Sequence, residues 1–144
     1  MTPGEVKRSV SVALFAPGGG RLLAVRRPPD DDELPGLWGL PAASLGPRES
    51  HREAVERVGR DKLGVALAPG EVLAEGSVER PAYRLEMRLF GARILSGRPE
   101  VPQPAEGVTQ YVAWEWASPD RLRASARRGS LCSRLCLEHL GESW

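Results

Sequence analysis

The segment from residue 36 to residue 65 carries the side chains best suited to chemistry. A loop rich in Gly and Pro leads into a charged stretch that contains Glu49, Arg57, Asp61 and Lys62. Carboxylates are the hard oxygen ligands that Mg²⁺ prefers, and a lysine can contact phosphate as a point charge. The segment reads as a loop that leads into a helix, and it brings together carboxylates that could hold a metal ion and a lysine that could contact phosphate.

The helix that must hold these groups has clear signals at both ends. Ser50 and Glu53 have the spacing of a capping box, and Gly64 is a typical C-terminal stop. We therefore predict a helix from Ser50 to about Leu63. At about 100° per residue, Glu53 lies roughly 140° around this helix from Val58, so Glu53 is predicted to serve capping and to face solvent.

The rest of the chain predicts a sheet that would support this helix. Apolar and charged residues alternate over 82–95, which indicates a strand with one wet face. Strands are predicted at residues 9–16, 21–28, 71–80, 82–95 and 109–117, and an amphipathic closing helix at 130–140. The first two strands flank a PGGG turn and are expected to form a hairpin. We expect one domain over residues 1–144, of the α/β class, with a mixed sheet flanked by helices.

Composition limits the classes of partner. The 144-residue chain is 41% hydrophobic and 27% charged, with a net charge of +1. This near-neutral charge argues against long-range attraction to nucleic acid, which is an unlikely partner. No apolar run is long enough to span a membrane, and the first ten residues lack a signal-peptide pattern. These features favour a cytoplasmic location.

Residues 34–65 resemble a Nudix box, the signature of hydrolases that act on a nucleoside diphosphate linked to another group. In the alignment, Glu49 and Arg57 match the box, and Ala43 stands where the box opens with Gly. The later segment 116–122 resembles the strand-to-helix segment of the same family. The resemblance implies a Nudix-type α/β/α sandwich, with a mixed β-sheet flanked by helices.

The resemblance also implies a divalent cation, Mg²⁺ or Mn²⁺, held by carboxylates of the box helix. Val58 and Lys62 replace two of the three helix carboxylates, and Asp61 stands in for the remaining one. The candidate catalytic residues are Arg57, Asp61 and Glu49. The candidate metal ligands are Glu49, Asp61 and the backbone carbonyl of Ala43. The candidate substrate-binding residues are Lys62, Trp38 and Arg27.

Two functions stay open at this point. One is a pyrophosphohydrolase with a divergent metal site and reduced or altered activity, in which Glu86 or Glu106 supplements Asp61 and Glu49. The alternative is a non-catalytic Nudix-fold domain that binds a small nucleotide-type ligand or a protein partner. In the second reading Lys62 meets phosphate directly, which preserves anion binding and loses metal catalysis.

A third reading is an isomerase of prenyl diphosphates, an enzyme built on the same fold. It needs a reactive Cys in the active site, whereas Cys132 and Cys136 both fall in the predicted closing helix. The sequence pattern therefore disfavours it. The exposed strand pattern permits a homodimer without requiring one.

Overall fold

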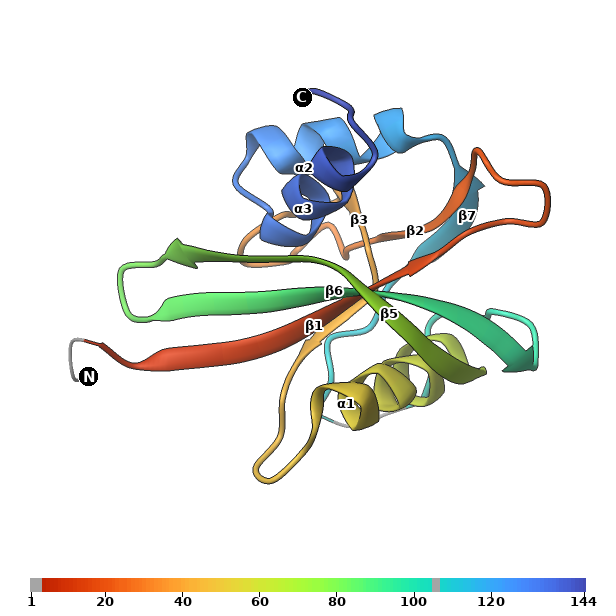
Figure 1. Ribbon diagram of the computed structural model, residues 1–144, viewed down its shortest axis with the longest axis horizontal. Helices are drawn as coiled ribbons and strands as arrows, with labels where there is room; N and C mark the ends of the chain where they lie inside the picture. Colours follow the sequence, from red (N-terminus) through yellow and green to blue (C-terminus); the bar gives the residue numbers. More distant parts are fainter. Residues whose placement is uncertain (1–3, 105–106) are drawn as a thin grey trace.

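Seven strands form two sheets that lie between helical layers in a computed structural model, which describes residues 4–104 and 107–144 (Figure 1). The strands are β1 (Val6–Leu14), β2 (Leu22–Arg26), β3 (Trp38–Gly39), β4 (Ala42–Ser44), β5 (Ala66–Glu79), β6 (Arg84–Ser96) and β7 (Ala113–Ala117). The helical elements are α1 (His51–Val58), the π-helical turn η1 (Gly59–Leu63), the 3-10 turn η2 (Pro119–Leu122), α2 (Arg123–Arg127) and α3 (Leu131–His139).

The larger sheet is mixed, as predicted. Its order is β4-β1-β6-β5, with β1 and β6 parallel and the other neighbours antiparallel. The smaller sheet, β3-β2-β7, is antiparallel. The predicted hairpin of the first two strands is wrong, because β4 and β6 occupy both edges of β1 and leave β2 to pair with β3 and β7. One isolated bridge, between Phe15 and Leu22, is what joins the two strands across the turn.

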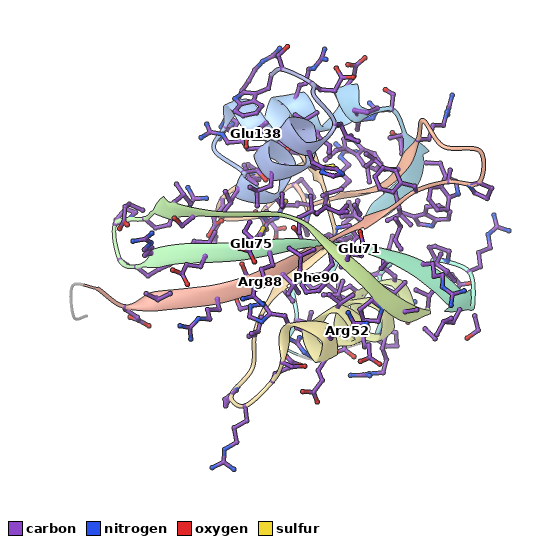
Figure 2. All side chains as sticks on the ribbon, viewed as in Figure 1. Arg52, Glu71, Glu75, Arg88, Phe90 and Glu138 are labelled. Atoms are coloured by element: carbon purple, nitrogen blue, oxygen red, sulfur yellow. The ribbon has the colours of Figure 1, made fainter. Side chains whose placement is uncertain are left out.

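Two hydrophobic clusters hold the layers together. One joins α1 to the larger sheet, and Phe90 packs in it (Figure 2). The other joins α2 and α3 to the opposite face, through residues such as Met87 and Leu135. The alternation predicted for residues 82–95 is confirmed, since Met87 and Leu89 are buried while Arg84 and Arg88 are exposed. The next residue, Phe90, packs in the α1 cluster while Leu89 packs in the α2–α3 cluster, so β6 contributes to both cores.

The predicted capping box of α1 is confirmed. Ser50 Oγ accepts a hydrogen bond from the Glu53 amide, and the Glu53 carboxylate accepts one from the Ser50 amide. The helix continues through η1 and stops at Gly64, whose φ of +69° is left-handed. Val58 is 1% exposed and packs in the core, whereas Glu53 faces solvent as predicted.

The predicted closing helix is α3, which begins after the N-cap Ser130. Its face toward the sheet is apolar and includes Leu131, Leu135 and Cys136. Cys132 and Cys136 are free thiols, and burial raises the pKa of Cys136 to about 12. Among the described residues, no helix has the length and apolar character needed to cross a membrane.

Candidate functional site

A cavity of about 430 Å³ lies beside residues 42–44 and 57–62, and most of its charged lining residues are cations. We call it the cationic cavity. Its charged lining residues are the cations Lys7, Arg27, Arg57, Lys62 and Arg80 and the acid Glu33. Its volume is within the range of small-molecule sites. Arg27 and Arg57 also contact Asp31 and Glu49, which are not among the described lining residues. Even with these two acids and Glu33 counted, the five cations leave a net positive charge around the cavity, which favours an anion.

Lys62 projects from η1 into this cavity. Its Nζ donates a hydrogen bond to the Ala42 carbonyl oxygen at 2.6 Å and lies 5.1 Å from the centre of the Tyr111 ring. Loss of hydration on burial, followed by the charges of Arg27 and Arg57, lowers the pKa of Lys62 to about 8. An anion bound beside this amine would offset both effects and favour its charged form.

The Ala42 backbone ties the lysine to a buried tyrosine. Tyr111 is 5% exposed, and its hydroxyl accepts a hydrogen bond from the Ala42 amide at 3.0 Å. Burial raises the pKa of Tyr111, so the phenol stays neutral. Tyr111 therefore holds β4 in place through the Ala42 amide, and the Ala42 carbonyl oxygen accepts the hydrogen bond from the Lys62 ammonium.

Arg57 and Glu49 form a bidentate ion pair at the side of the cavity. Arg57 Nε and Nη2 donate to the two Glu49 carboxylate oxygens at 2.8 and 2.9 Å, and Nη2 also donates to the Ser44 carbonyl oxygen at 2.7 Å. The Gly46 amide adds a third hydrogen bond to Glu49. The Arg57 hydrogen bonds lower the pKa of Glu49 and Glu49 in turn raises that of Arg57. The pair braces the β4–α1 loop.

The other two predicted substrate-binding residues reach the same region. Arg27 lines the cavity, and its Nε lies 3.2 Å from Asp31 Oδ2 without the alignment of a hydrogen bond. A small adjoining cavity of about 80 Å³ shares Arg27 and Lys62 and has Trp38 in its wall. The guanidinium of Arg121 lies 5.3 Å from the centre of the Trp38 ring, so one face of this indole is covered.

The predicted metal ligands are not gathered into a cation site. Ala43 lines the cationic cavity, but the lining residues do not include Glu49 or Asp61. Glu49 already accepts three hydrogen bonds, and Asp61 Oδ1 lies 3.4 Å from Arg60 Nε. Within residues 4–104 and 107–144, no group of three or more His, Cys, Asp or Glu could hold a metal ion. The donor set described here does not fit Mg²⁺ or Mn²⁺, which need several oxygen ligands.

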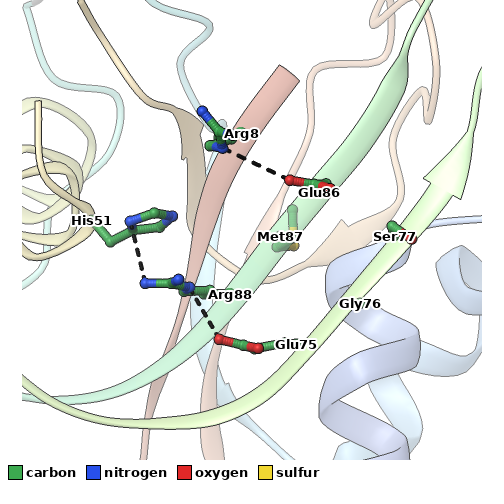
Figure 3. A pocket seen from close by; sticks show the side chains of 8 residues that line it. All are labelled: Arg8, His51, Glu75, Gly76, Ser77, Glu86, Met87 and Arg88. Atoms are coloured by element: carbon green, nitrogen blue, oxygen red, sulfur yellow. Dashed lines mark hydrogen bonds and ion pairs between the residues drawn. The ribbon is translucent and has the colours of Figure 1, made fainter. Parts of the chain in front are cut away.

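Glu86, weighed from the sequence as an additional ligand, lies elsewhere, and so does Glu115, an acid near the late strand-to-helix segment. Glu86 pairs with Arg8 and lines a separate cavity of about 330 Å³ on the α1 side of the larger sheet, where Arg88 also pairs with Glu75 (Figure 3). Glu115 is on β7 and pairs with Arg121. Glu106 lies outside the described residues. Glu86 and Glu115 are therefore paired with arginines away from the cationic cavity.

Several cavity residues were not found from the sequence. Lys7 comes from the start of β1, while Arg80 and Tyr83 come from the turn between β5 and β6. Cys132, on α3, lines both the cationic cavity and the small adjoining one. The position of the cysteines in the closing helix is therefore no argument against a thiol at the site. Only the packing of α3 against the sheet reveals this, because Cys132 lies far along the chain from the box.

Comparison with known proteins bears on the family. A family model described as the NUDIX domain matches residues 5–135. The isopentenyl-diphosphate Delta-isomerase of Halorhodospira halophila is 31% identical in an alignment of 132 residues that covers 87% of this chain and 71% of that protein.

Two solved structures share the fold. The MutT protein from Methanosarcina mazei Go1 has a TM-score of 0.72 and 16% identity, and the alignment covers 98% of this chain and 94% of that one. A NUDIX hydrolase from Nitrosomonas europaea has a TM-score of 0.75 and 19% identity, with 95% and 89% covered. These likenesses agree with the predicted mixed sheet flanked by helices. The matched domain model and the 31% identical relative together show that this chain belongs to the Nudix hydrolase superfamily.

Proposed function

We propose that this protein binds a diphosphate-bearing small molecule, of nucleotide type, in the cationic cavity without a divalent cation, and that its hydrolytic activity is strongly reduced. The observation that carries the proposal is the Lys62 ammonium, which occupies the position of a box carboxylate and is bonded to the Ala42 carbonyl oxygen. A fixed protein cation thus stands where the family resemblance implies a metal ligand.

Electrostatics supports binding of the anion and opposes binding of the metal. A divalent cation about 4 Å from the Lys62 ammonium would meet a repulsion of about 8 kcal/mol at an effective dielectric constant of 20. At the same distance and dielectric constant, the Lys62 ammonium would attract each negative charge of a phosphate group by about 4 kcal/mol. Arg27 and Arg57 lie near enough to lower the pKa of Lys62, so their charges act in the same direction.

A second candidate is slow metal-dependent hydrolysis. It is favoured by the positions of Glu49 and Asp61, which both lie close enough to Arg57 to raise its pKa. Release of Glu49 from Arg57 would be needed before its carboxylate could accept a cation. The family is one of hydrolases, so this reading has to be tested beside the first.

The Halorhodospira halophila relative is named for a second diphosphate compound, isopentenyl diphosphate. Cys132 in the cavity wall would supply a thiol beside such a ligand. For this reason isopentenyl diphosphate belongs in the panel of compounds, beside ADP-ribose as the nucleotide-type ligand.

The test combines calorimetric binding and product analysis with both compounds, in EDTA and then with Mg²⁺ or Mn²⁺. We expect binding in EDTA, a loss of affinity of at least tenfold in Lys62→Gln, and no metal-dependent product above the EDTA blank. The matched control is Arg60→Gln, which removes an exposed cation of the same helical turn outside the cavity. Binding that requires Mg²⁺, together with product formation that Asp61→Asn abolishes, would support the hydrolase instead. Isomerised product that is lost in Cys132→Ala would support the isomerase.

A further inference from the structure

The five cations of the cavity fall into two groups. Arg57 and Lys62 are bonded to the backbone of β4, at Ser44 and Ala42 respectively, and with Arg27 they form the inner cations. Lys7 and Arg80 form the outer cations.

The register of the larger sheet separates the two groups. Ser9 of β1 pairs with Ser44, and Lys7 lies two residues further toward the N-terminus. Two residues of a strand span about 7 Å, so the outer group begins about that far along β1 from the strand held by the inner cations. The cavity therefore extends along β1 rather than ending at Lys62.

Contacts with neighbouring groups hold both outer cations in position. Lys7 Nζ lies 4.7 Å from the centre of the Tyr83 ring, and Arg80 Nη2 donates to the Gly129 carbonyl oxygen at 3.1 Å. Tyr83 is itself tied to Arg80, whose amide donates to the Tyr83 carbonyl oxygen at 2.8 Å. The two cations are thus preorganised, which lowers the entropy that a ligand must remove on binding.

These cations lack the counterions that their neighbours have. Among the described residues, no carboxylate oxygen lies within 4 Å of the Lys7 or Arg80 side-chain nitrogens. Arg8 and Arg84, next in sequence to Lys7 and Tyr83, both pair with Glu86. The pair of Arg8 with Glu86 is visible in Figure 3. Within the part of the chain that the structure describes, the arginines on the α1 side of this sheet thus have carboxylate partners, whereas Lys7 and Arg80 in the cavity have none.

We propose that Lys7 and Arg80 form a second anion subsite, so that the cavity takes a phosphate chain longer than a diphosphate, or a diphosphate whose other end carries a further anionic group. This deepens the proposed function and rests on it. The inner cations hold one end of the anion and the outer cations hold the other. Leu85 and Met87 also line the cavity, and their apolar surfaces strengthen the attraction by limiting the access of water.

Calorimetric titration with tripolyphosphate and with pyrophosphate in EDTA tests this subsite. We expect wild-type protein to bind tripolyphosphate at least tenfold more tightly, and Lys7→Gln and Arg80→Gln each to reduce that preference about tenfold or more. The matched controls Arg8→Gln and Arg84→Gln, which alter the opposite side of the same strands, are expected to keep it. Because Arg80 bonds to Gly129, thermal unfolding should confirm that each variant folds, and Lys7→Gln alone decides the question if Arg80→Gln does not.

The outcomes distinguish the two proposals. If Lys62→Gln weakens both anions but Lys7→Gln leaves the preference intact, the second subsite is wrong and the proposed function stands. If wild-type protein binds neither anion, the proposed function fails and the subsite with it. Equal loss of preference in Arg8→Gln and Lys7→Gln would show a general charge effect and would overturn the subsite.

Discussion

Replacement of Lys62 by Met should change how the stability of the protein depends on pH. Burial and the neighbouring charges of Arg27 and Arg57 lower the pKa of Lys62 from 10.5 to about 8, against the smaller raising effects of Asp61 and Cys132. At about 1.4 kcal/mol per pKa unit, this difference corresponds to an upper limit of about 3–4 kcal/mol. The free energy is the cost of holding the charged amine in the fold.

The sign follows from proton binding. Between pH 8 and pH 10.5 the unfolded chain holds the Lys62 proton more firmly than the folded protein does, so the free energy of unfolding rises with pH. Below about pH 8 the full cost is present, and above pH 10.5 it is gone. Met lacks the ionisable group, so the stability of Lys62→Met relative to wild type should fall by up to about 3–4 kcal/mol across this interval.

Urea unfolding at several pH values between 7.5 and 10.5 measures this difference, because other ionisable groups contribute equally to both proteins. Leu63→Met is the matched control, since it introduces the same side chain at the next position and removes no ionisable group. Its unfolding curve should shift by a constant amount at every pH. If the free energies of unfolding of Lys62→Met and wild type depend on pH in the same way, Lys62 does not carry a charge that is costly to bury. That result would also weaken the proposed role of Lys62 at the site.

Three further changes test the elements that hold the site. Glu49→Gln removes the charge that Arg57 contacts and should lower the free energy of unfolding by about 1–3 kcal/mol at pH 7. Because Arg57 lowers the pKa of Glu49, that stabilisation should be present above pH 4.5 and lost as the pH falls further, which acid titration of unfolding would show. Ser50→Ala removes the N-cap of α1 and should cost about 1 kcal/mol in urea unfolding, with Ser50→Thr as the conservative control. Gly64→Ala places a Cβ at a φ of +69° and 2.5 Å from Gln103 Nε2, so its melting temperature should fall, whereas Gly19→Ala has the same backbone strain in open space and should lose less.

The box segment could be understood from sequence because its signals are local. The capping box and Gly64 mark the ends of α1 and η1 through bonds within a few residues, and both were predicted correctly. The alternation over 82–95 also identified β6, because side chains of a strand alternate between faces. Strands β3 and β4 were not predicted, since two or three residues are too few to show a period. The strand-to-helix resemblance of residues 116–122 pointed to the start of η2, but α2 was not predicted as an element of its own, since its five residues carry no side-chain cap.

The resemblance to the family, the mixed fold and the unusual Val58 and Lys62 of the box could all be recognised from the amino-acid sequence, because each depends on residue order along one segment or on local periodicity. That Lys7, Arg80 and Cys132 share a cavity with Lys62 could be seen only in the folded chain. Their meeting depends on the parallel pairing of β1 with β6 and on the packing of α3 across the sheet. Such contacts join residues far apart in the chain, and the charge of a cavity is a property of their sum rather than of any segment.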